Sequence, residues 1–227
     1  MAQVFREHGL AAFIPQHWPP MSLVIFMVLG GCTSGPEGPA DLLFEGDSDI
    51  ALWDTSGYPD AVNIGVGGAV CKDVLDTLED TLQTYQPDVV VLVCGENDLW
   101  DQSASATFDT FSAVVSRIHE SSATVYYLGT KPEPSTTSLH AAYREYDALI
   151  RAHATSLAAG GAGSLIMIDV YNGFEAQGNP DSLYQDDGLH LSNEGYALWD
   201  AWLAAAFAQD SCVLWEDGVC ATSAQTP

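Results

Sequence analysis

The feature that most constrains the fold is an alternation of short apolar segments with helix-like segments. Five runs rich in Val, Ile, Leu and Tyr read as strands, several of them apolar without interruption: residues 41–47, 61–66, 88–95, 123–129 and 164–170. Continuous apolar runs are typical of strands that are buried on both faces of a sheet. Helix-like periodicity covers the segments between and after them: residues 70–84, 104–120, 138–159 and 192–208. The alternation predicts an α/β fold in which helices cover both faces of a parallel sheet of about five strands.

Polar and glycine residues follow the first three predicted strands. Ser48 comes just after the first strand, behind Gly46, and the glycines of residues 63–68 end the second. Asn97 follows the third strand. Functional groups of a parallel sheet gather beyond the carboxyl ends of its strands, so we expect these residues at one edge. They would supply a hydroxyl nucleophile together with backbone and side-chain N–H donors.

A further pair of residues stands in the segment "DGLHLSNEGY" at 187–196. Ser192 can cap the helix that follows it, which needs no catalytic explanation. Asp187 and His190 stand three apart in a turn that contains glycine. An Asp that holds one imidazole nitrogen while the other faces a nucleophile is the arrangement that a general base needs.

These motifs, in this order, resemble those of the SGNH, or GDSL-type, hydrolases. Gly46-Asp47-Ser48 is similar to the first block of the family, a glycine of residues 63–68 to the second, Gly95-Glu96-Asn97-Asp98 to the third and Asp187-Gly188-Leu189-His190 to the last. The resemblance implies the family's three-layer α/β/α sandwich with a flavodoxin-like sheet.

The resemblance also implies a role for each matching residue. Ser48 would be the nucleophile, His190 the base that deprotonates it, and Asp187 the residue that orients His190. The Ser48 N–H, Gly68 and Asn97 would form the oxyanion hole. In the family the second-block glycine lies five residues after the asparagine that ends the strand, so the resemblance selects Gly68, five residues after Asn63, over its neighbouring glycines.

Three functions are compatible with these residues. The first is a serine esterase that removes short acyl groups, such as acetyl, from a carbohydrate or another neutral alcohol, and we favour it because the spare segments 130–137 and 171–186 are polar. The second is a lipase or lysophospholipase acting at a membrane, and the third is a non-catalytic glycan-binding relative. Trp53 and Trp100 could flank the site and stack on a sugar, and ordinary packing is an equal alternative.

The charge balance excludes one class of partner. Six Lys and Arg residues against 31 Asp and Glu residues give a net charge of −25, which would repel DNA or RNA. No motif typical of a metal site is present, and we expect neither a metal nor a cofactor. Asp49 and Glu96 flank the predicted site, and the sequence leaves open whether they face it, where they would raise the pKa of His190, or point elsewhere.

The first 40 residues do not resemble part of the domain. Residues 1–31 are similar to a bacterial lipoprotein signal peptide, in which case Cys32 would be lipidated and anchor an exported protein to a membrane of the cell envelope. Ordinary export with an incidental Cys32 is the alternative. Residues 32–40 predict a flexible tether, residues 41–210 the hydrolase domain and residues 211–227 a tail.

Four cysteines remain after Cys32, an even number that fits an oxidising compartment. Cys212 and Cys220 enclose a short loop with an Asp-Gly turn and are the better candidates for a disulfide. Cys71 and Cys94 form a second pair, or they are two buried free thiols.

Overall fold

The sheet of this protein is parallel and has five strands, as the alternation predicts. The computed structural model describes residues 39–161, 163–208, 215–216 and 219–220, all within one compact unit, Gly35–Pro227. The strands are β1 (Leu42–Gly46), β2 (Ala61–Asn63), β3 (Val89–Val93), β4 (Thr124–Leu128) and β5 (Leu165–Ile168). Their order is β2-β1-β3-β4-β5, and every pairing is parallel. This is the flavodoxin-like order, which confirms the predicted fold class.

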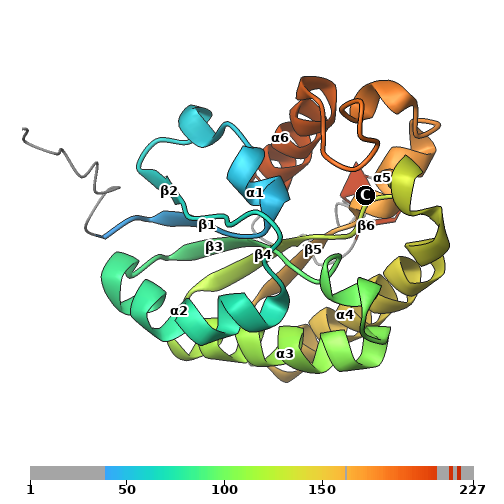
Figure 1. Cartoon of the computed structure of the whole chain (residues 1–227). Coiled ribbons are helices and arrows are strands. Elements are labelled where there is room, and N and C mark those ends of the chain that lie inside the picture. The colour runs from blue at the N-terminus through green and yellow to red at the C-terminus, as the bar shows by residue number, and fades with distance from the viewer. Residues whose placement is uncertain (1–38, 162, 209–214, 217–218, 221–227) are drawn as a thin grey trace, which may run out of the picture. The chain divides into compact units, whose positions relative to one another are not determined.

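Helices cover the two faces of the sheet, which gives three layers (Figure 1). One face carries α2 (Cys71–Tyr85), α3 (Ala104–Glu120) and α4 (His140–Gly160). The other carries α1 (Ser48–Leu52), α5 (Val170–Ala176) and α6 (Asn193–Phe207). Short 3₁₀ helices lie in the connections: η1 (Thr55–Gly57), η2 (Asp98–Trp100), η3 (Pro134–Leu139) and η4 (Asp181–Leu183).

Alternate residues of each strand enter the two cores. In β3, Val90 and Leu92 pack with α2, α3 and α4, whereas Val91 and Val93 pack on the side of α6. All four side chains are at most 3 % exposed. Two-sided burial explains why the strand reads as an unbroken apolar run.

Two helices were not among the predicted elements. α1 begins directly at Ser48, and α5 occupies the start of the segment 171–186, which the sequence suggested was spare. Both are short and each is capped by an aspartate: Asp47 accepts a hydrogen bond from the N–H of Asp49, and Asp169 one from the N–H of Asn172. Helices of five and seven residues carry too little periodicity to be seen in the sequence.

The C-terminal region contributes a small antiparallel pair, β6 (Trp215–Glu216) with β7 (Val219–Cys220). The predicted lipidation site Cys32 lies outside the described residues, and so do Cys212 and the side chain of Cys220. Across the described part of the chain, no helix combines the length and apolar character needed to cross a membrane.

Candidate active site

Ser48 is the first residue of α1, immediately beyond β1. The turn requires glycine at Gly46, where φ is +148° and a Cβ would lie 2.1 Å from the carbonyl oxygen of Val93. Asp47 caps the helix, because its side chain accepts a hydrogen bond of 2.9 Å from the N–H of Asp49. The sharp turn leaves Ser48 half-buried, with its side chain at the edge of a cavity.

Asp187 and His190 form a hydrogen-bonded pair within one loop. Asp187 Oδ2 lies 2.7 Å from His190 Nδ1, and Asp187 Oδ1 accepts the N–H groups of Leu189 and His190 at 3.0 Å each. Burial alone would raise the pKa of Asp187, but these hydrogen bonds outweigh it and lower the pKa to about 2. Since Nδ1 is engaged by a carboxylate, Nε2 is the imidazole nitrogen that can accept a proton.

The loop that carries this pair is held at both ends and at its tip. Tyr184 and Leu191 form an antiparallel bridge that closes the loop. Ser135 of η3 donates its N–H and its hydroxyl to the carbonyl oxygen of Gly188, at 3.0 and 2.9 Å. The His190 position is therefore fixed by a second segment of the chain.

Ser48 and His190 line one cavity of about 20 Å³, roughly the space of a single water molecule. Its other lining residues are Asp47, Asp49, Glu96, Asn97, Trp100, Lys131, Glu133, Tyr143 and Leu189. Within the described part of the chain, the Ser48 hydroxyl forms no hydrogen bond, either to His190 or to another group. Catalytic hydrogen bonds are often loose until substrate is bound, so shared lining of the cavity is the informative geometry.

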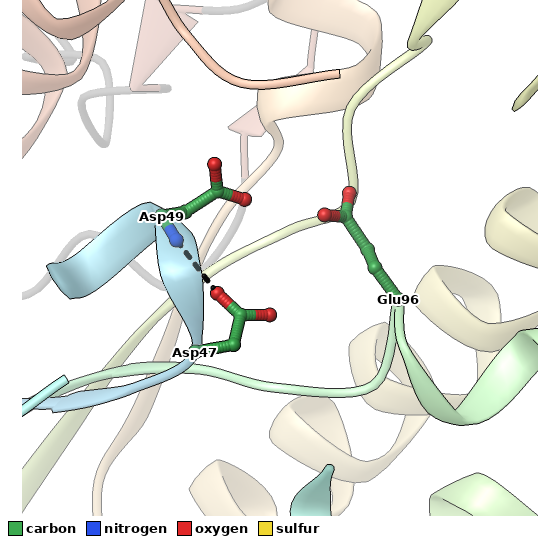
Figure 2. A group of neighbouring side chains, drawn as sticks. All are labelled: Asp47, Asp49 and Glu96. Carbon is green, nitrogen blue, oxygen red and sulfur yellow. Dashed lines mark hydrogen bonds between the residues drawn. The ribbon is translucent and has the colours of Figure 1, made fainter. Parts of the chain in front are cut away.

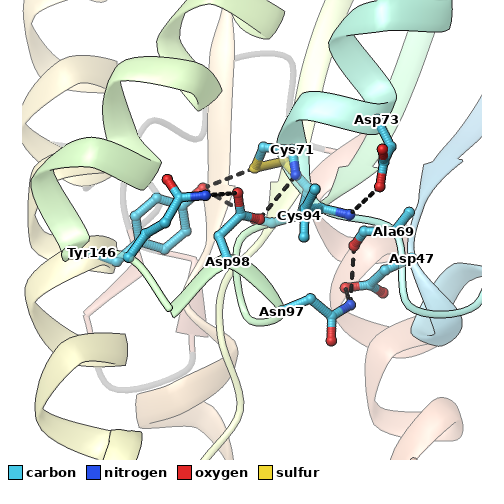
Figure 3. Close-up of a disulfide and its surroundings, with 10 residues drawn as sticks. Asp47, Ala69, Cys71, Asp73, Cys94, Asn97, Asp98 and Tyr146 are labelled. Carbon is cyan, nitrogen blue, oxygen red and sulfur yellow. Dashed lines mark hydrogen bonds between the residues drawn. A yellow bond between two sulfur atoms is a disulfide. The ribbon is translucent and has the colours of Figure 1, made fainter. Parts of the chain in front are cut away.

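Asn97 reaches this cavity from the segment after β3. Its Nδ2 donates to the carbonyl oxygen of Ala69 at 3.0 Å and lies 3.5 Å from Asp47 Oδ2 (Figure 3). An amide nitrogen carries two hydrogens, and the long contact with Asp47 leaves one of them available to a stronger acceptor. The structure thus places Ser48, Asn97 and His190 around one cavity.

The structure does not bring Gly68 to this cavity. Gly68 is exposed, has φ +77° and lines a separate cavity of about 270 Å³ together with Glu45 and Val66. The turn that contains Gly68 is closed by a hydrogen bond of 3.0 Å from the N–H of Ala69 to the carbonyl oxygen of Val66. Its expected place in the oxyanion hole has no support in this geometry.

The two tryptophans differ. Trp53 is 3 % exposed, donates from Nε1 to Asp200 at 3.0 Å and stacks with the ring of Tyr196. The interpretation that it flanks the substrate is therefore wrong, because aromatic packing behind α1 buries it. Trp100 lines the cavity and is 58 % exposed, so it keeps the position predicted for it.

One wall of the cavity is a buried cluster of charged side chains, which we call the lysine cluster: Asp49, Glu96, Lys131 and Glu133. Lys131 Nζ donates to Asp49 Oδ2 at 2.6 Å, to Glu96 Oε2 at 2.5 Å and to Glu133 Oε1 at 2.6 Å. Figure 2 shows Asp49 and Glu96 on two different segments, with Asp47 beside them. The open question about Asp49 and Glu96 is resolved, since both border the cavity but are bound by Lys131.

Burial shifts the pKa values in this region. Burial raises the pKa of Asp47 to about 8, the Asp49 carboxylate adds to the rise and Lys131 opposes it. Burial likewise raises the pKa of Glu96 well above its ordinary value. For Lys131 burial lowers the pKa, but the surrounding carboxylates outweigh it and raise the pKa well above the ordinary value. The ammonium therefore stays protonated at neutral pH.

The same acids have the spacing of a metal site. Asp47, Asp49 and Glu96 each offer a carboxylate oxygen within 4.8 Å of the other two. Two of the three already accept a hydrogen bond from Lys131, so an ammonium supplies the positive charge here.

Sequence reasoning missed Lys131 and Glu133. One signal could have found them, because Lys131 stands three residues beyond β4 and so at the same edge of the sheet as Ser48 and Asn97. It is also one of only six basic residues in a chain with 31 acidic ones.

A disulfide links two of the segments that lead to the site. It joins Cys71, at the start of α2, to Cys94, just after β3 (Figure 3). The Tyr146 hydroxyl donates to the carbonyl oxygen of Cys94 at 3.0 Å, and Asp98 Oδ2 accepts the N–H of Cys71 at 2.9 Å. Of the two alternatives for these cysteines, the structure has the disulfide, and it fixes the segment that leads to Asn97.

Comparisons with known proteins can now be set beside this geometry. A protein-family model described as GDSL-like Lipase/Acylhydrolase family matches residues 46–198, more than half of the chain. No curated protein matches the chain. The match begins at Gly46, two residues before Ser48, and ends beyond His190, so it includes every residue that lines the cavity.

Several solved structures share the fold. An alpha/beta hydrolase enzyme from the metagenome of Lake Arreo, Spain, has a TM-score of 0.62 and 18% identity, over 78% of this chain and 99% of that one. A member of the lipolytic G-D-S-L family from Veillonella parvula has a TM-score of 0.61 and 18% identity, over 74% and 98%. An acetyl-xylooligosaccharide esterase variant from Geobacillus has a TM-score of 0.57 and 18% identity, over 79% and 97%.

Proposed function

Because the chain belongs to the GDSL-like lipase/acylhydrolase family, we propose that it is a serine esterase specific for short acyl groups, such as acetyl, carried by a carbohydrate or another neutral alcohol. The family makes it an ester-hydrolysing enzyme. The choice of acyl group and alcohol is our inference from the cavity around Ser48.

In the proposed mechanism, His190 Nε2 takes the proton of the Ser48 hydroxyl as the serine oxygen attacks the ester carbonyl carbon. Asp187, ionised and bonded to Nδ1, stabilises the imidazolium that forms. The alcohol leaves with the proton from His190, and the acyl group stays on Ser48 as an ester. Water, deprotonated by His190, then attacks this ester, and the proton returns to Ser48 as the acid leaves.

The negative oxygen of the tetrahedral intermediate needs N–H donors. We assign this role to Asn97 Nδ2, which lines the cavity, and to the N–H of Ser48 at the first position of α1. The Ser48 N–H is one of the unpaired donors of the helix start, where the backbone favours negative charge. Loss of one such donor typically costs about 3 kcal/mol of transition-state stabilisation.

The observation that carries the short-chain proposal is the small, charged cavity beside Ser48. Its volume of about 20 Å³ and its wall of buried carboxylates leave no room for a long acyl chain. A larger hollow of about 440 Å³ begins at Asp187 and Gly188, and its other lining residues are Pro134, Ser135, Asp181, Tyr184, Gln185 and Asp186. We place the alcohol part of the substrate there, and its acidic walls favour a neutral, hydroxyl-bearing group over an anionic one.

A specific observation favours the lipase alternative. Among the described residues, the exposed large hydrophobic side chains are Leu52, Val66 and Trp100. They follow β1, β2 and β3 and so border the edge of the sheet where Ser48 lies. Such residues could contact a lipid surface, and the chain-length profile must decide.

The test is kcat/KM for the 4-nitrophenyl esters of acetate, butyrate, octanoate and palmitate at fixed salt. We expect acetate to lead and palmitate to be the poorest substrate, with all activity lost in Ser48→Ala. A maximum at octanoate or palmitate would replace the short-chain proposal by the lipase alternative. Failure of Ser48 to react with a fluorophosphonate would point to the non-catalytic, glycan-binding alternative.

We further propose that the enzyme is exported and lipid-anchored through Cys32, on the resemblance of residues 1–31 to a lipoprotein signal. Two acyl chains would give stable anchoring where one is marginal. Expressed in a bacterial host, the wild type should label with a radioactive fatty acid and sediment with membranes, whereas Cys32→Ser should do neither. Wild-type protein that is neither labelled nor bound to membranes would leave ordinary export as the explanation.

A further inference from the structure

The lysine cluster connects three segments that are distant in the sequence. Asp49 lies in α1, Glu96 follows β3, and Lys131 and Glu133 follow β4. The Lys131 side chain is 2 % exposed, and its main-chain N–H also donates to Glu96 Oε1 at 2.6 Å. Lys131 therefore donates two hydrogen bonds to Glu96 and one to Asp49 of α1.

Two of these carboxylates are direct neighbours of the reacting groups. Asp49 follows Ser48 in the chain, and Glu96 precedes Asn97. Asp49 is held from the other side as well, since the Tyr196 hydroxyl donates to its carbonyl oxygen at 2.8 Å. The backbone that carries the nucleophile and the backbone that carries the amide donor thus meet at one ammonium.

The chemistry of the cluster suits a lysine. An ammonium has three N–H donors and no acceptor, and three carboxylate oxygens take all three. Glu133 has further partners, because its Oε2 accepts the hydroxyls of Thr136 and Tyr143 at 2.7 and 3.1 Å. Without the ammonium, Asp49 and Glu96 would lose the bonds to Nζ and repel one another in a buried space.

We propose that Lys131 is a positioning residue for ester hydrolysis, whose ammonium fixes the distance between the Ser48 hydroxyl and the Asn97 amide through Asp49 and Glu96. This inference rests on the roles proposed above for Ser48 and Asn97. Displacing a reacting group by about 1 Å can cost on the order of 100-fold in rate. Lys131 acts on the geometry of the transition state, so its loss lowers kcat more than it raises KM.

The first test is Lys131→Met, a side chain of similar length without charge, assayed on 4-nitrophenyl acetate. We expect kcat to fall about 100-fold and KM to change less than about threefold. The matched control is Lys72→Met, because Lys72 is an exposed lysine paired with Asp76 on α2. Its kcat should stay within about twofold of the wild type.

A second variant separates positioning from folding. Lys131→Met combined with Asp49→Asn and Glu96→Gln removes the repulsion and keeps side chains of the same shape, while Glu133 retains its bonds to Thr136 and Tyr143. We expect this triple variant to fold, by circular dichroism and thermal unfolding, and still to show the low kcat. Wild-type kcat in the folded triple variant would overturn the positioning role and leave Lys131 as a purely structural residue.

A third measurement is chemical rescue of Lys131→Ala by propylammonium, compared with sodium at equal ionic strength. Restored kcat with propylammonium alone supports the role of the ammonium, and no difference between the two ions contradicts it. A different result would refute the proposed function: Ser48→Ala would retain the turnover of the wild type. A wild-type kcat in folded Lys131→Met refutes the positioning role alone.

Discussion

Asp187 and Asp47 border the same site, yet their surroundings move their pKa values in opposite directions. Asp187 is half exposed and accepts three hydrogen bonds from its own loop, which lower its pKa to about 2. Asp47 is buried beside the lysine cluster, and burial raises its pKa to about 8. The Asp187–His190 pair is thus exposed to solvent and held mainly by hydrogen bonds within its own loop. The surroundings of Ser48 are buried, and they depend on contacts between distant segments.

This difference predicts two kinds of response to mutation. Changes in the 187–190 loop should affect the chemistry and leave the fold almost unchanged, because its partners are nearby and exposed. Changes beside Ser48 should affect stability and chemistry together, because buried charged groups depend on one another.

The largest expected effect is that of His190→Ala. Loss of the base should lower kcat on 4-nitrophenyl acetate by at least ~1000-fold, while the free energy of unfolding changes by less than ~1 kcal/mol. Steady-state kinetics and urea unfolding measure the two quantities on the same protein. His119→Ala is the control, since His119 lies at the end of α3, at the opposite edge of the sheet. A large loss of stability in His190→Ala would contradict the small structural role that we expect for this exposed side chain.

The next effect concerns Asp47 and the pH dependence of stability. Because burial raises the pKa of Asp47 to about 8, the folded protein keeps a proton on Asp47 up to about that pH, whereas an unfolded chain releases it near the ordinary value of 3.8. Between these two pH values the folded state binds more protons than the unfolded chain. The contribution of Asp47 to the free energy of unfolding is therefore fully present in acid and is lost as the pH rises through about 8. We therefore expect the free energy of unfolding to fall by several kcal/mol as the pH rises across this window.

Asp47→Asn keeps an N-cap and cannot titrate, so it should flatten this dependence. Urea unfolding at pH about 5, 7 and 9 compares the two proteins, with the exposed Asp109→Asn as the control. Asp187 has the opposite sign, since its contribution is lost as pH falls toward 2, but its exposure keeps that contribution small. Parallel curves for wild type and Asp47→Asn would contradict the assignment.

The smallest expected effect is that of Trp100→Ala. Trp100 is exposed at the mouth of the cavity, where its ring can pack on a sugar. KM for an acetylated oligosaccharide should rise by about threefold to tenfold, with little change for 4-nitrophenyl acetate. Leu52→Ala, at another exposed apolar position, is the matched control. An equal rise for both substrates would indicate that Trp100 shapes the cavity rather than binding the sugar.

The parts of this site that could be predicted are those encoded within short segments. Asp187 and His190 stand three residues apart, and Ser48 is placed by its own strand end and by Gly46. The five strands were also predictable, because two-sided burial leaves continuous apolar runs. In each case the sequence pattern that allows the prediction lies within a few consecutive residues.

The remaining features depend on contacts between distant segments. Lys131 reaches Asp49 across 82 positions and Glu96 across 35, and no local pattern records such a pairing. Trp53 is buried by Asp200 and Tyr196 of α6, which the sequence does not place beside it. Gly68 lies in a turn that Val66 and Ala69 close, and it lines a separate cavity. The spacing from Asn63 does not specify which cavity this glycine lines.

The stretch 131–135 is the physical link between the two halves of the site. At one end Lys131 donates its N–H to Glu96, and at the other Ser135 donates its N–H to Gly188 in the loop of His190. Local opening of these five residues would break both bonds in one event, so we expect the two halves to behave as one unit in native-state hydrogen exchange. The amides of Lys131 and Ser135 should then exchange with a common opening free energy, although Lys131 contacts the buried side of the site and Ser135 the solvated side.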